Sequence, residues 1–271
     1  MKLAREYLIL LSALRLKAPL VHNLTSATVA NFTANALLAL GAAPAMVESL
    51  DEIPGFVTVA HALSVNLGSL TPARSAAITL AVQTAQICGT PWVLDPVGAG
   101  GIPARTAFAR HLLSQKPAAI RGNASEILGL AGESGFGRGV DSGRGSEQAI
   151  AAAQAVARQS GAVVAVTGVI DYVTDGVATL ALEGGHAMMT RVTGMGCAAS
   201  AIVAACVGVE TDRLRAVASA LSFVGIAGAR AAKRVAGPGS LAVAYLDELA
   251  ALDRPGGISD VSDLRSVSPA P

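Results

Sequence analysis

Residues 62–95, ALSVNLGSLTPARSAAITLAVQTAQICGTPWVLD, contain one complete unit of the fold. Apolar runs predict a strand over Ala62–Asn66 and another over Pro91–Leu94, and helical spacing predicts a helix over Pro72–Cys88 between them. Pro72 suits the first turn of that helix. Strands joined in this way lie parallel in one sheet, so this stretch predicts an α/β fold.

The same alternation extends in both directions. Towards the N-terminus we expect helices over Lys2–Leu16 and Ser26–Leu40, and strands over Leu20–His22 and Ala43–Val47. After Asp95 the expected elements are, in chain order, helix Pro103–Ser114, strand Ala118–Arg121, helix Ser125–Gly129, helix Ser146–Gln159, strand Ala162–Thr167, strands Tyr172–Thr174 and Ala178–Leu182, and helices Cys197–Val207, Asp212–Lys233 and Gly239–Leu252. This order predicts a mostly parallel sheet with helices on both faces and ligands at the carboxyl ends of its strands.

Two segments are interpreted as connections within or after a single domain. Asp175-Gly176 indicates a hairpin with a primed turn. Gly132–Gly145 is rich in Gly and Ser, but a further helix and strand follow it, so we interpret it as a mobile loop and not as a domain linker. We predict one domain over residues 1–253 and a flexible C-terminal tail over residues 254–271, where Pro, Gly, Ser and Asp accumulate.

The composition limits the kind of protein. The chain has 271 residues, of which 52% are hydrophobic and 14% charged, and its mean hydropathy is +0.53. This balance leaves more apolar surface than a compact monomer exposes, and it predicts a homo-oligomer. A net charge of +1 argues against a nucleic-acid partner.

The sequence also favours a cytoplasmic protein that does not enter a membrane. The N-terminal segment interleaves charged and apolar residues at helical spacing, unlike a signal peptide. Ser75–Leu94 and Val192–Val209 lack charges, but Gly89 and Pro91 interrupt the first and a Thr-Gly-Met-Gly turn opens the second, so we expect buried α/β elements. The three cysteines are too few for a disulfide framework or a zinc cluster and suit a reducing compartment.

The strongest local motif is Arg191-Val-Thr-Gly-Met-Gly-Cys197, which leads directly into an apolar helix. The first N–H groups of a helix lack intrahelical partners and the helix dipole is positive there, so an anion can bind. Gly194 and Gly196 allow a phosphate to approach the backbone closely. Taken alone, such glycines more often only make a tight entry into a packed helix.

Cys197 lies in the first turn of the same helix, where the dipole is expected to lower the pKa of its thiol. It is a candidate nucleophile, a weak base or a small buried residue. A nucleophilic hydrolase needs a histidine partner, and none of the four histidines lies in a recognisable partner motif.

Polar residues follow three successive strands. Asp95 ends one strand, Arg121-Gly-Asn-Ala-Ser-Glu126 follows the next, and Thr167 ends a third. Asp95 is placed to face a metal–phosphate group, Arg121 to contact phosphate, and Asn123 with Glu126 to orient hydrated magnesium. Taken alone, Asp95 has an ordinary role as a turn cap, Glu126 as a helix cap and Thr167 as a polar strand end, and it is their shared position after strands that favours the functional interpretation.

Three earlier strand ends carry less polar groups. His22-Asn-Leu-Thr-Ser26 follows the first strand, Ala45-Met-Val47 ends the second and Asn66-Leu-Gly68 ends the third. The Met46 thioether suits a flat heterocycle, although a lone methionine in an apolar run is usually part of the core.

The ordered set of motifs resembles the hydroxyethylthiazole kinase family, over about residues 5–252. The similar motifs are Val21-His-Asn-Leu-Thr25, Ala30-Asn-Phe-Thr-Ala-Asn-Ala-Leu-Leu-Ala-Leu-Gly-Ala42, Asn66-Leu-Gly68, Asp95-Pro-Val-Gly-Ala-Gly100, Arg121-Gly-Asn-Ala-Ser-Glu126, Val166-Thr-Gly168 and Thr193-Gly-Met-Gly-Cys197.

The resemblance implies a ribokinase-like three-layer sandwich and ATP-dependent phosphorylation of the hydroxyl of 4-methyl-5-(2-hydroxyethyl)thiazole, for thiazole salvage in thiamine biosynthesis. It also implies Mg²⁺ and a homotrimer with thiazole sites between adjacent subunits. By position, Met46 and Gly194 match substrate contacts, and Arg121 and Thr167 match ATP contacts.

The remaining positions carry over in the same way. Asp95 and Glu126 match the magnesium and phosphate region, and Asn23, Gly68 and Cys197 line the thiazole side. Many ribokinase-like kinases have an aspartate base where Cys197 stands, and the thiazole kinases resemble this sequence in having cysteine. The Thr193–Cys197 turn, with Gly194 and Gly196, then forms the anion hole, and a loose phosphoryl transition state needs little base catalysis.

Two departures and two alternatives remain. Ser26 stands where the family often has Asn, and Gly101 where the glycine-rich turn often continues with Ala, which puts fine substrate contacts in doubt. An ATP-dependent hydrate dehydratase of the same fold, or a non-catalytic sensor of thiazoles, would share parts of this pattern. The cysteine at position 197 argues against the first, and the intact polar set at the strand ends argues against the second.

Overall fold

The computed structural model describes residues 2–133, 145–254 and 264–267, and there nine strands form one sheet. The strand order is β2-β1-β3-β4-β5-β6-β7-β8-β9. The first six strands in this order run parallel, and β7, β8 and β9 each pair antiparallel with the strand before them. The strands are β1 (Leu20–Leu24), β2 (Ala43–Ala45), β3 (Ala62–Asn66), β4 (Trp92–Asp95), β5 (Ala119–Asn123), β6 (Val163–Thr167), β7 (Ile170–Thr174), β8 (Thr179–Glu183) and β9 (Leu264–Val267).

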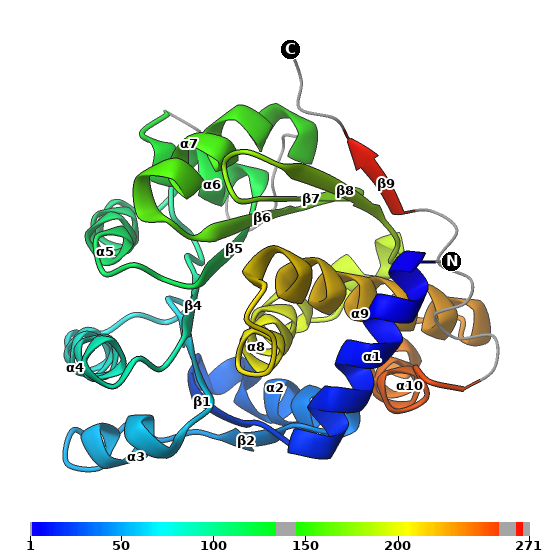
Figure 1. Cartoon of the computed structure of the whole chain (residues 1–271), viewed down its shortest axis with the longest axis horizontal. Helices are drawn as coiled ribbons and strands as arrows, with labels where there is room; N and C mark the ends of the chain where they lie inside the picture. The colour runs from blue at the N-terminus through cyan, green and yellow to red at the C-terminus, as the bar shows by residue number, and fades with distance from the viewer. Residues whose placement is uncertain (1, 134–144, 255–263, 268–271) are drawn as a thin grey trace.

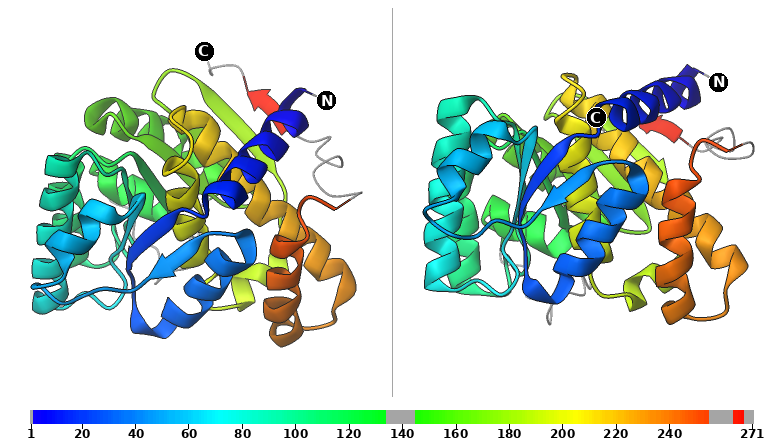
Figure 2. Two further views of the ribbon diagram at one scale, coloured as in Figure 1. Left: turned by 60° about the horizontal axis from the view of Figure 1, so that its bottom comes forward. Right: turned by 90° about the horizontal axis from the view of Figure 1, so that it is seen from below.

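Helices cover both faces of the sheet (Figures 1 and 2). One layer contains α3 (Ile53–Val59), α4 (Pro72–Cys88), α5 (Pro103–Leu113), α6 (Ala124–Ala131) and α7 (Ile150–Ser160). The other contains α1 (Lys2–Lys17), α2 (Ala27–Leu40), α8 (Met195–Val207), α9 (Arg213–Arg234) and α10 (Pro238–Ala250). Short 3₁₀ turns, η1 (Ser146–Ala149) and η2 (Ala187–Arg191), precede α7 and α8. The predicted three-layer α/β sandwich with a mostly parallel sheet is therefore confirmed.

Alternating side chains of the strands divide the interior into two cores. On β4, Trp92 and Leu94 pack in the core under α3–α7, whereas Val93 packs in the core around α8 and α9. On β3, Leu63 and Val65 belong to the first core and Ala62 to the second. Side chains alternate between the faces of a strand, so strands buried on both faces become the nearly continuous apolar runs of the sequence.

Helix α8 lies at the centre of the second layer. It packs against β1, β3, β4 and β5 and against α2 and α9, and its residues from Ala198 to Cys206 are all buried. Its many alanines allow this close approach. Helix α9 is long and apolar enough to cross a membrane by length and composition, but 67% of its most apolar window is buried inside the fold, as in a core helix of a globular protein.

Part of the predicted C-terminal tail pairs with the sheet. Leu264–Val267 forms β9, which pairs antiparallel with β8 from Thr179 to Leu182, and the flexibility of residues 254–271 stays a prediction. The open edge of β8 presents unpaired backbone groups, and an added strand satisfies them. Residues 255–263 and 268–271, and most of the predicted loop Gly132–Gly145, lie outside the described residues.

Two local predictions need correction. The β7–β8 hairpin forms, but Thr174 pairs with Thr179, so four residues connect the strands instead of a two-residue primed turn. The Asp175 carboxylate accepts the N–H groups of Val177 and Ala178 and closes this longer loop. Strand β2 ends at Ala45, two residues earlier than predicted, since the carbonyl of Val47 accepts a hydrogen bond from the His22 ring and not from a strand.

Candidate active site

The carboxyl ends of the parallel strands meet the N-terminus of α8 at one edge of the sheet. Asn66 ends β3 beside Asp95 at the end of β4, and Asn123 ends β5 beside Thr167 at the end of β6. A hydrogen bond of 2.8 Å from the Ser200 hydroxyl to Oδ2 of Asp95 ties α8 to the end of β4. The ATP-side residues predicted from sequence are thus brought to the same edge as the glycine-rich turn.

The first turn of α8 has the geometry of an anion site. Gly194 is the N-cap, with φ of +91°, a left-handed conformation that glycine adopts without strain. The intrahelical hydrogen bonds begin with Ala198 N–H donating to the carbonyl of Gly194 at 2.8 Å. The N–H groups of Met195, Gly196 and Cys197 therefore have no intrahelical acceptor and lie at the positive end of the helix dipole.

The guanidinium of Arg121 lies over this turn. A Cβ placed on Gly196 would be 2.7 Å from Nη1 of Arg121, so only glycine leaves room for the cation. Nη2 of Arg121 donates to Oγ1 of Thr167 at 2.6 Å, which fixes the guanidinium between β5, β6 and α8. Arg121, Thr167 and Gly196 together form one positively charged cradle.

Asp95 is buried, with 1% of its surface exposed. Its Oδ2 accepts hydrogen bonds from the amide of Asn66 and the hydroxyl of Ser200, each at 2.8 Å. Burial raises the pKa of the Asp95 carboxyl, while the Arg121 cation and the two hydrogen bonds oppose that rise. Donated hydrogen bonds and a nearby cation favour the ionised form.

Glu126 is held by the backbone at both carboxylate oxygens. Oε1 accepts the N–H of Gly98 at 3.0 Å and Oε2 accepts the N–H of Asn123 at 2.9 Å. The Asn123 side chain accepts the N–H of Glu126 in return, which completes a capping box at the start of α6. Burial, with the negative charge of Asp95 as the second cause, raises the pKa of Glu126 to about 7.

These two carboxylates fit a magnesium ion held partly by substrate. A cation between them would remove the repulsion that raises the pKa of Glu126, and Mg²⁺ usually takes one or two protein carboxylates together with phosphate and water oxygens. Among residues 2–133, 145–254 and 264–267, no group of three or more His, Cys, Asp or Glu side chains could hold a metal ion. The pair therefore suits a shared site and not a closed protein cage.

The prediction that the helix dipole favours a Cys197 thiolate is wrong. Burial raises the pKa of this thiol to about 12, and the negative Asp95 adds to the rise while Arg121 opposes it. The loss of hydration and the nearby carboxylate outweigh the dipole. Cys197 is thus a neutral thiol at physiological pH, which does not favour the covalent interpretation.

The thiazole-side candidates lie at the ends of β1, β2 and β3. Asn23 is fully buried, and its Oδ1 has no hydrogen-bond partner within the described part of the chain. Gly68 lies beside Ser26, and its N–H donates to Oδ1 of Asn66 at 2.8 Å. Met46 follows the edge strand β2 and is 36% exposed, so it lies at the rim and not in the core.

Sequence reasoning did not select Asn66, Ser200 or Asp171 as site residues. Asn66 appears in the sequence analysis as a strand end and as part of the Asn66-Leu-Gly68 motif, without a role of its own. For Ser200 the available signal was a polar residue within an apolar helix. Asp171 accepts the N–H of Gly168 at 2.9 Å, and burial raises its pKa to about 6 while Arg121 opposes the rise. The Asp171 carboxylate therefore stabilises the turn after Thr167.

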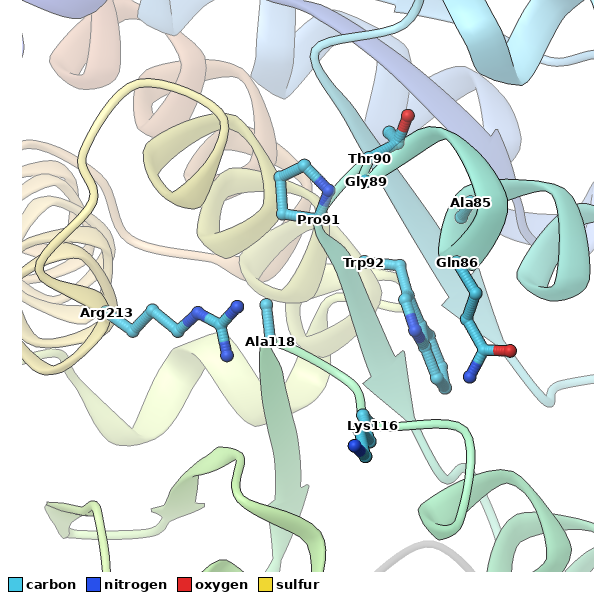
Figure 3. Close-up of a pocket in the computed structure, with 9 residues that line it drawn as sticks. All are labelled: Ala85, Gln86, Gly89, Thr90, Pro91, Trp92, Lys116, Ala118 and Arg213. Atoms are coloured by element: carbon cyan, nitrogen blue, oxygen red, sulfur yellow. The ribbon is translucent and has the colours of Figure 1, made fainter.

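A separate hollow of about 400 Å³ lies at the opposite ends of the strands (Figure 3). Trp92 and Ala118 lie at the start of β4 and just before β5, and Lys116 and Arg213 are the charged lining residues. It contains none of the predicted site residues, and no carboxylate lines it to hold a metal ion. The predicted site residues lie instead at the edge near α8.

Comparisons with known proteins agree with this arrangement. The sequence model of the hydroxyethylthiazole kinase family matches residues 11–255. The chain belongs to this family. The hydroxyethylthiazole kinase of Tolumonas auensis is 56% identical over 245 residues, which cover 90% of this chain and 92% of the relative.

Solved structures extend the agreement to the fold. The hydroxyethylthiazole kinase of Pyrococcus horikoshii OT3 has a TM-score of 0.89 and 38% identity, covering 97% of this chain and 99% of its own. A ribokinase-like superfamily protein of Enterococcus faecalis V583 has a TM-score of 0.61 at 12% identity over 85% of this chain and 86% of its own, a likeness of fold alone. The kinase described here therefore has the ribokinase-like architecture predicted from its sequence.

Proposed function

We propose that this kinase transfers the γ-phosphoryl group of ATP to the hydroxyl of 4-methyl-5-(2-hydroxyethyl)thiazole, the reaction of thiazole salvage in thiamine biosynthesis. The observation that carries the proposal is the Arg121 guanidinium lying over the glycine-rich first turn of α8, beside the carboxylates of Asp95 and Glu126. Family membership supports the reaction class.

Different groups of the site would stabilise different phosphates. The free N–H groups after Gly194 would hold the transferred phosphoryl group, and Gly196 gives it access to the backbone. Arg121, fixed by Thr167, would neutralise the charge on the ATP phosphates. Asp95 and Glu126, with Asn123 as the helix cap, would hold Mg²⁺, which would supply positive charge to offset that of the phosphates.

Cys197 contributes shape more than proton transfer in this proposal. Its neutral thiol lies at the same helix end as the anion site, where the hydroxyl of the substrate must approach the phosphorus. A loose phosphoryl transition state leaves the nucleophile protonated until late, so alignment matters more than a strong base. A small, weakly polar side chain at this position is chemically sufficient.

The thiazole side of the site supports a shared position between subunits. Met46 follows the edge strand β2 and is half-exposed, and Leu38 and Leu50 near it in the sequence are 59% and 51% exposed. A second subunit covering this edge would bury these side chains and enclose a thiazole ring beside Asn23 and Gly68. We propose the homotrimer on this basis, and a cytoplasmic location as the compartment of thiamine synthesis.

The activity is tested with purified protein, ATP, Mg²⁺ and the thiazole alcohol, by following thiazole phosphate and ADP together. We expect both products in equal amounts. Arg121→Met should raise the KM for ATP at least tenfold, since it removes a charge-assisted phosphate contact. Arg158→Met is the matched control, because the Arg158 guanidinium donates to the carbonyl of Gly176 in the β7–β8 hairpin loop, outside the proposed site.

The same assay separates the alternatives. ADP without thiazole phosphate, but with turnover of a hydrated nucleotide, would indicate a dehydratase, and binding without ADP would indicate a sensor. The trimer is tested by light scattering with Leu50→Glu, which should dissociate the assembly and raise the KM for the thiazole. Val177→Glu, at a more exposed apolar position in the hairpin loop beyond β7, should change neither.

A further inference from the structure

One oxygen of Asp95 receives two hydrogen bonds from two different elements. The amide of Asn66 at the end of β3 and the hydroxyl of Ser200 in α8 both donate to Oδ2 at 2.8 Å. All three residues are buried, with exposures of 1 to 2%. On folding, the polar atoms of these three residues therefore lose their contacts with water and hydrogen-bond to one another. The fold fixes the geometry of these hydrogen bonds.

The hydroxyl of Ser200 departs from the usual behaviour of a buried helical serine. Ser219 and Ser222 in α9 donate back to the carbonyls of Arg215 and Ala218, four residues earlier, at 2.7 and 2.9 Å. Ser200 has the same option at the carbonyl of Gly196, but that distance is 3.3 Å, longer than the 2.8 Å to Asp95. A hydroxyl has one hydrogen, and here it points to the carboxylate.

The amide of Asn66 is fixed in one orientation. Its Oδ1 accepts the N–H of Gly68 at 2.8 Å, so its Nδ2 must face Asp95. The amide also lies within hydrogen-bonding reach of the Cys197 thiol. Asn66 thereby joins the thiazole-side turn after β3, the carboxylate of β4 and the first turn of α8.

We propose that Asn66 and Ser200 are positioning residues that hold the anion-binding turn of α8 in register with the Asp95 carboxylate. Both donors bond to Oδ2 of Asp95, and the cation would bind at Oδ1. Ser200 follows Gly196 by one helical turn, so its bond to Asp95 sets the distance from the phosphate turn to the metal carboxylate. Phosphoryl transfer depends on this alignment, because positioning and charge supply most of its catalysis.

The inference rests on the proposed placement of Mg²⁺ at Asp95, and the test separates the two. We would compare Ser200→Ala and Asn66→Ala with Ser219→Ala, a matched removal of a buried helical hydroxyl. Mn²⁺ binding in the presence of ADP, measured by electron paramagnetic resonance, gives a readout independent of turnover. Steady-state kinetics would give the Mg²⁺ dependence, kcat and the KM for the thiazole.

We expect Ser200→Ala to lower kcat and weaken Mn²⁺ binding by roughly tenfold to a hundredfold, the range for losing a hydrogen bond to a charged group. The KM for the thiazole should stay within about twofold, Ser200→Thr should recover most of the loss, and Ser219→Ala should behave as the unaltered enzyme. Asn66→Ala should weaken Mn²⁺ binding in the same way. Equal Mn²⁺ affinity and kcat in Ser200→Ala and Ser219→Ala would overturn the inference.

Asp95→Asn distinguishes the two possible failures. If it abolishes Mn²⁺ binding while Ser200→Ala does not weaken it, the magnesium placement stands and the positioning role is refuted. If Asp95→Asn binds Mn²⁺ as tightly as the unaltered enzyme, the proposed metal placement is itself wrong, and the positioning role falls with it.

Discussion

Gly196→Ala tests the cradle in which the Arg121 guanidinium lies over the first turn of α8. The added Cβ would be 2.7 Å from Nη1 of Arg121 and 3.4 Å from its Cζ and Nη2. To reach ordinary van der Waals contact, Nη1 must move by about 0.7 Å. The obstacle is the end of a long side chain, so the guanidinium moves and the backbone does not.

This movement should lower the activity but not the stability. If the guanidinium moves this far away from Thr167, the 2.6 Å hydrogen bond from Nη2 lengthens to about 3.3 Å and weakens. A misplacement near 1 Å can reduce a rate by about a hundredfold, so we expect kcat/KM for ATP to fall about tenfold to a hundredfold. Stability should not fall, since Gly→Ala within a helix stabilises by about 0.5–1 kcal/mol.

The assay combines steady-state kinetics in ATP with thermal unfolding. Gly239→Ala is a close control: both glycines are the second residue of their helix, and a Cβ on Gly239 meets no atom within 4 Å. We expect Gly239→Ala to keep full activity. If Gly196→Ala has a kcat and a KM for ATP within about twofold of this control, the cradle is not part of the ATP site.

Three further predictions follow from the same contacts. Thr167→Val removes the acceptor of Arg121 Nη2 and should raise the KM for ATP about tenfold, whereas Thr167→Ser should not; equal KM values for the two variants would contradict the contact. Cys197→Asp should retain or increase turnover, and Cys197→Ser and Cys197→Ala should leave measurable activity; complete loss in a folded Cys197→Ala would point to covalent catalysis. Because the folded-state pKa of Glu126 is raised to about 7, the metal-free enzyme binds a proton that the unfolded chain releases, so this group lowers stability as pH rises from about 4.5 to about 7. Mg²⁺ should therefore raise Tm more at about pH 8 than at about pH 5.5, and Glu126→Gln should remove that difference; an equal shift at both pH values in the unaltered enzyme would count against a metal at Glu126.

Much of the site was predictable because strand ends are visible in sequence. A parallel sheet places all its carboxyl ends along one edge, so Asp95, Arg121 and Thr167 could be grouped before any coordinates were known. The glycine-rich turn also predicted the start of α8, because a glycine turn before an apolar run is a local feature of the sequence. Asn66 and Ser200 were not predicted as site residues, because their role depends on hydrogen bonds to Asp95, which lies on another element.

The ionisation of Cys197 shows the limit of local reasoning. Its position at a helix N-terminus predicted a lowered pKa, and burial together with Asp95 reversed the direction. Desolvation and through-space charge depend on which strands and helices surround a residue, and neither is encoded in its neighbours along the chain.

The sequence by itself determined the order of elements, the α/β class, the polar strand ends and the family, because periodicity, glycine turns and motif order are local properties of the chain. The tertiary structure alone decided that Leu264–Val267 completes the sheet, that Ser200 turns from its own helix to Asp95, and that Arg121 lies over Gly196. Each of these features is a contact between segments that lie far apart in the chain, and the packing of the fold sets the distance between them. The chemistry at this edge of the sheet depends on those distances to within about 1 Å.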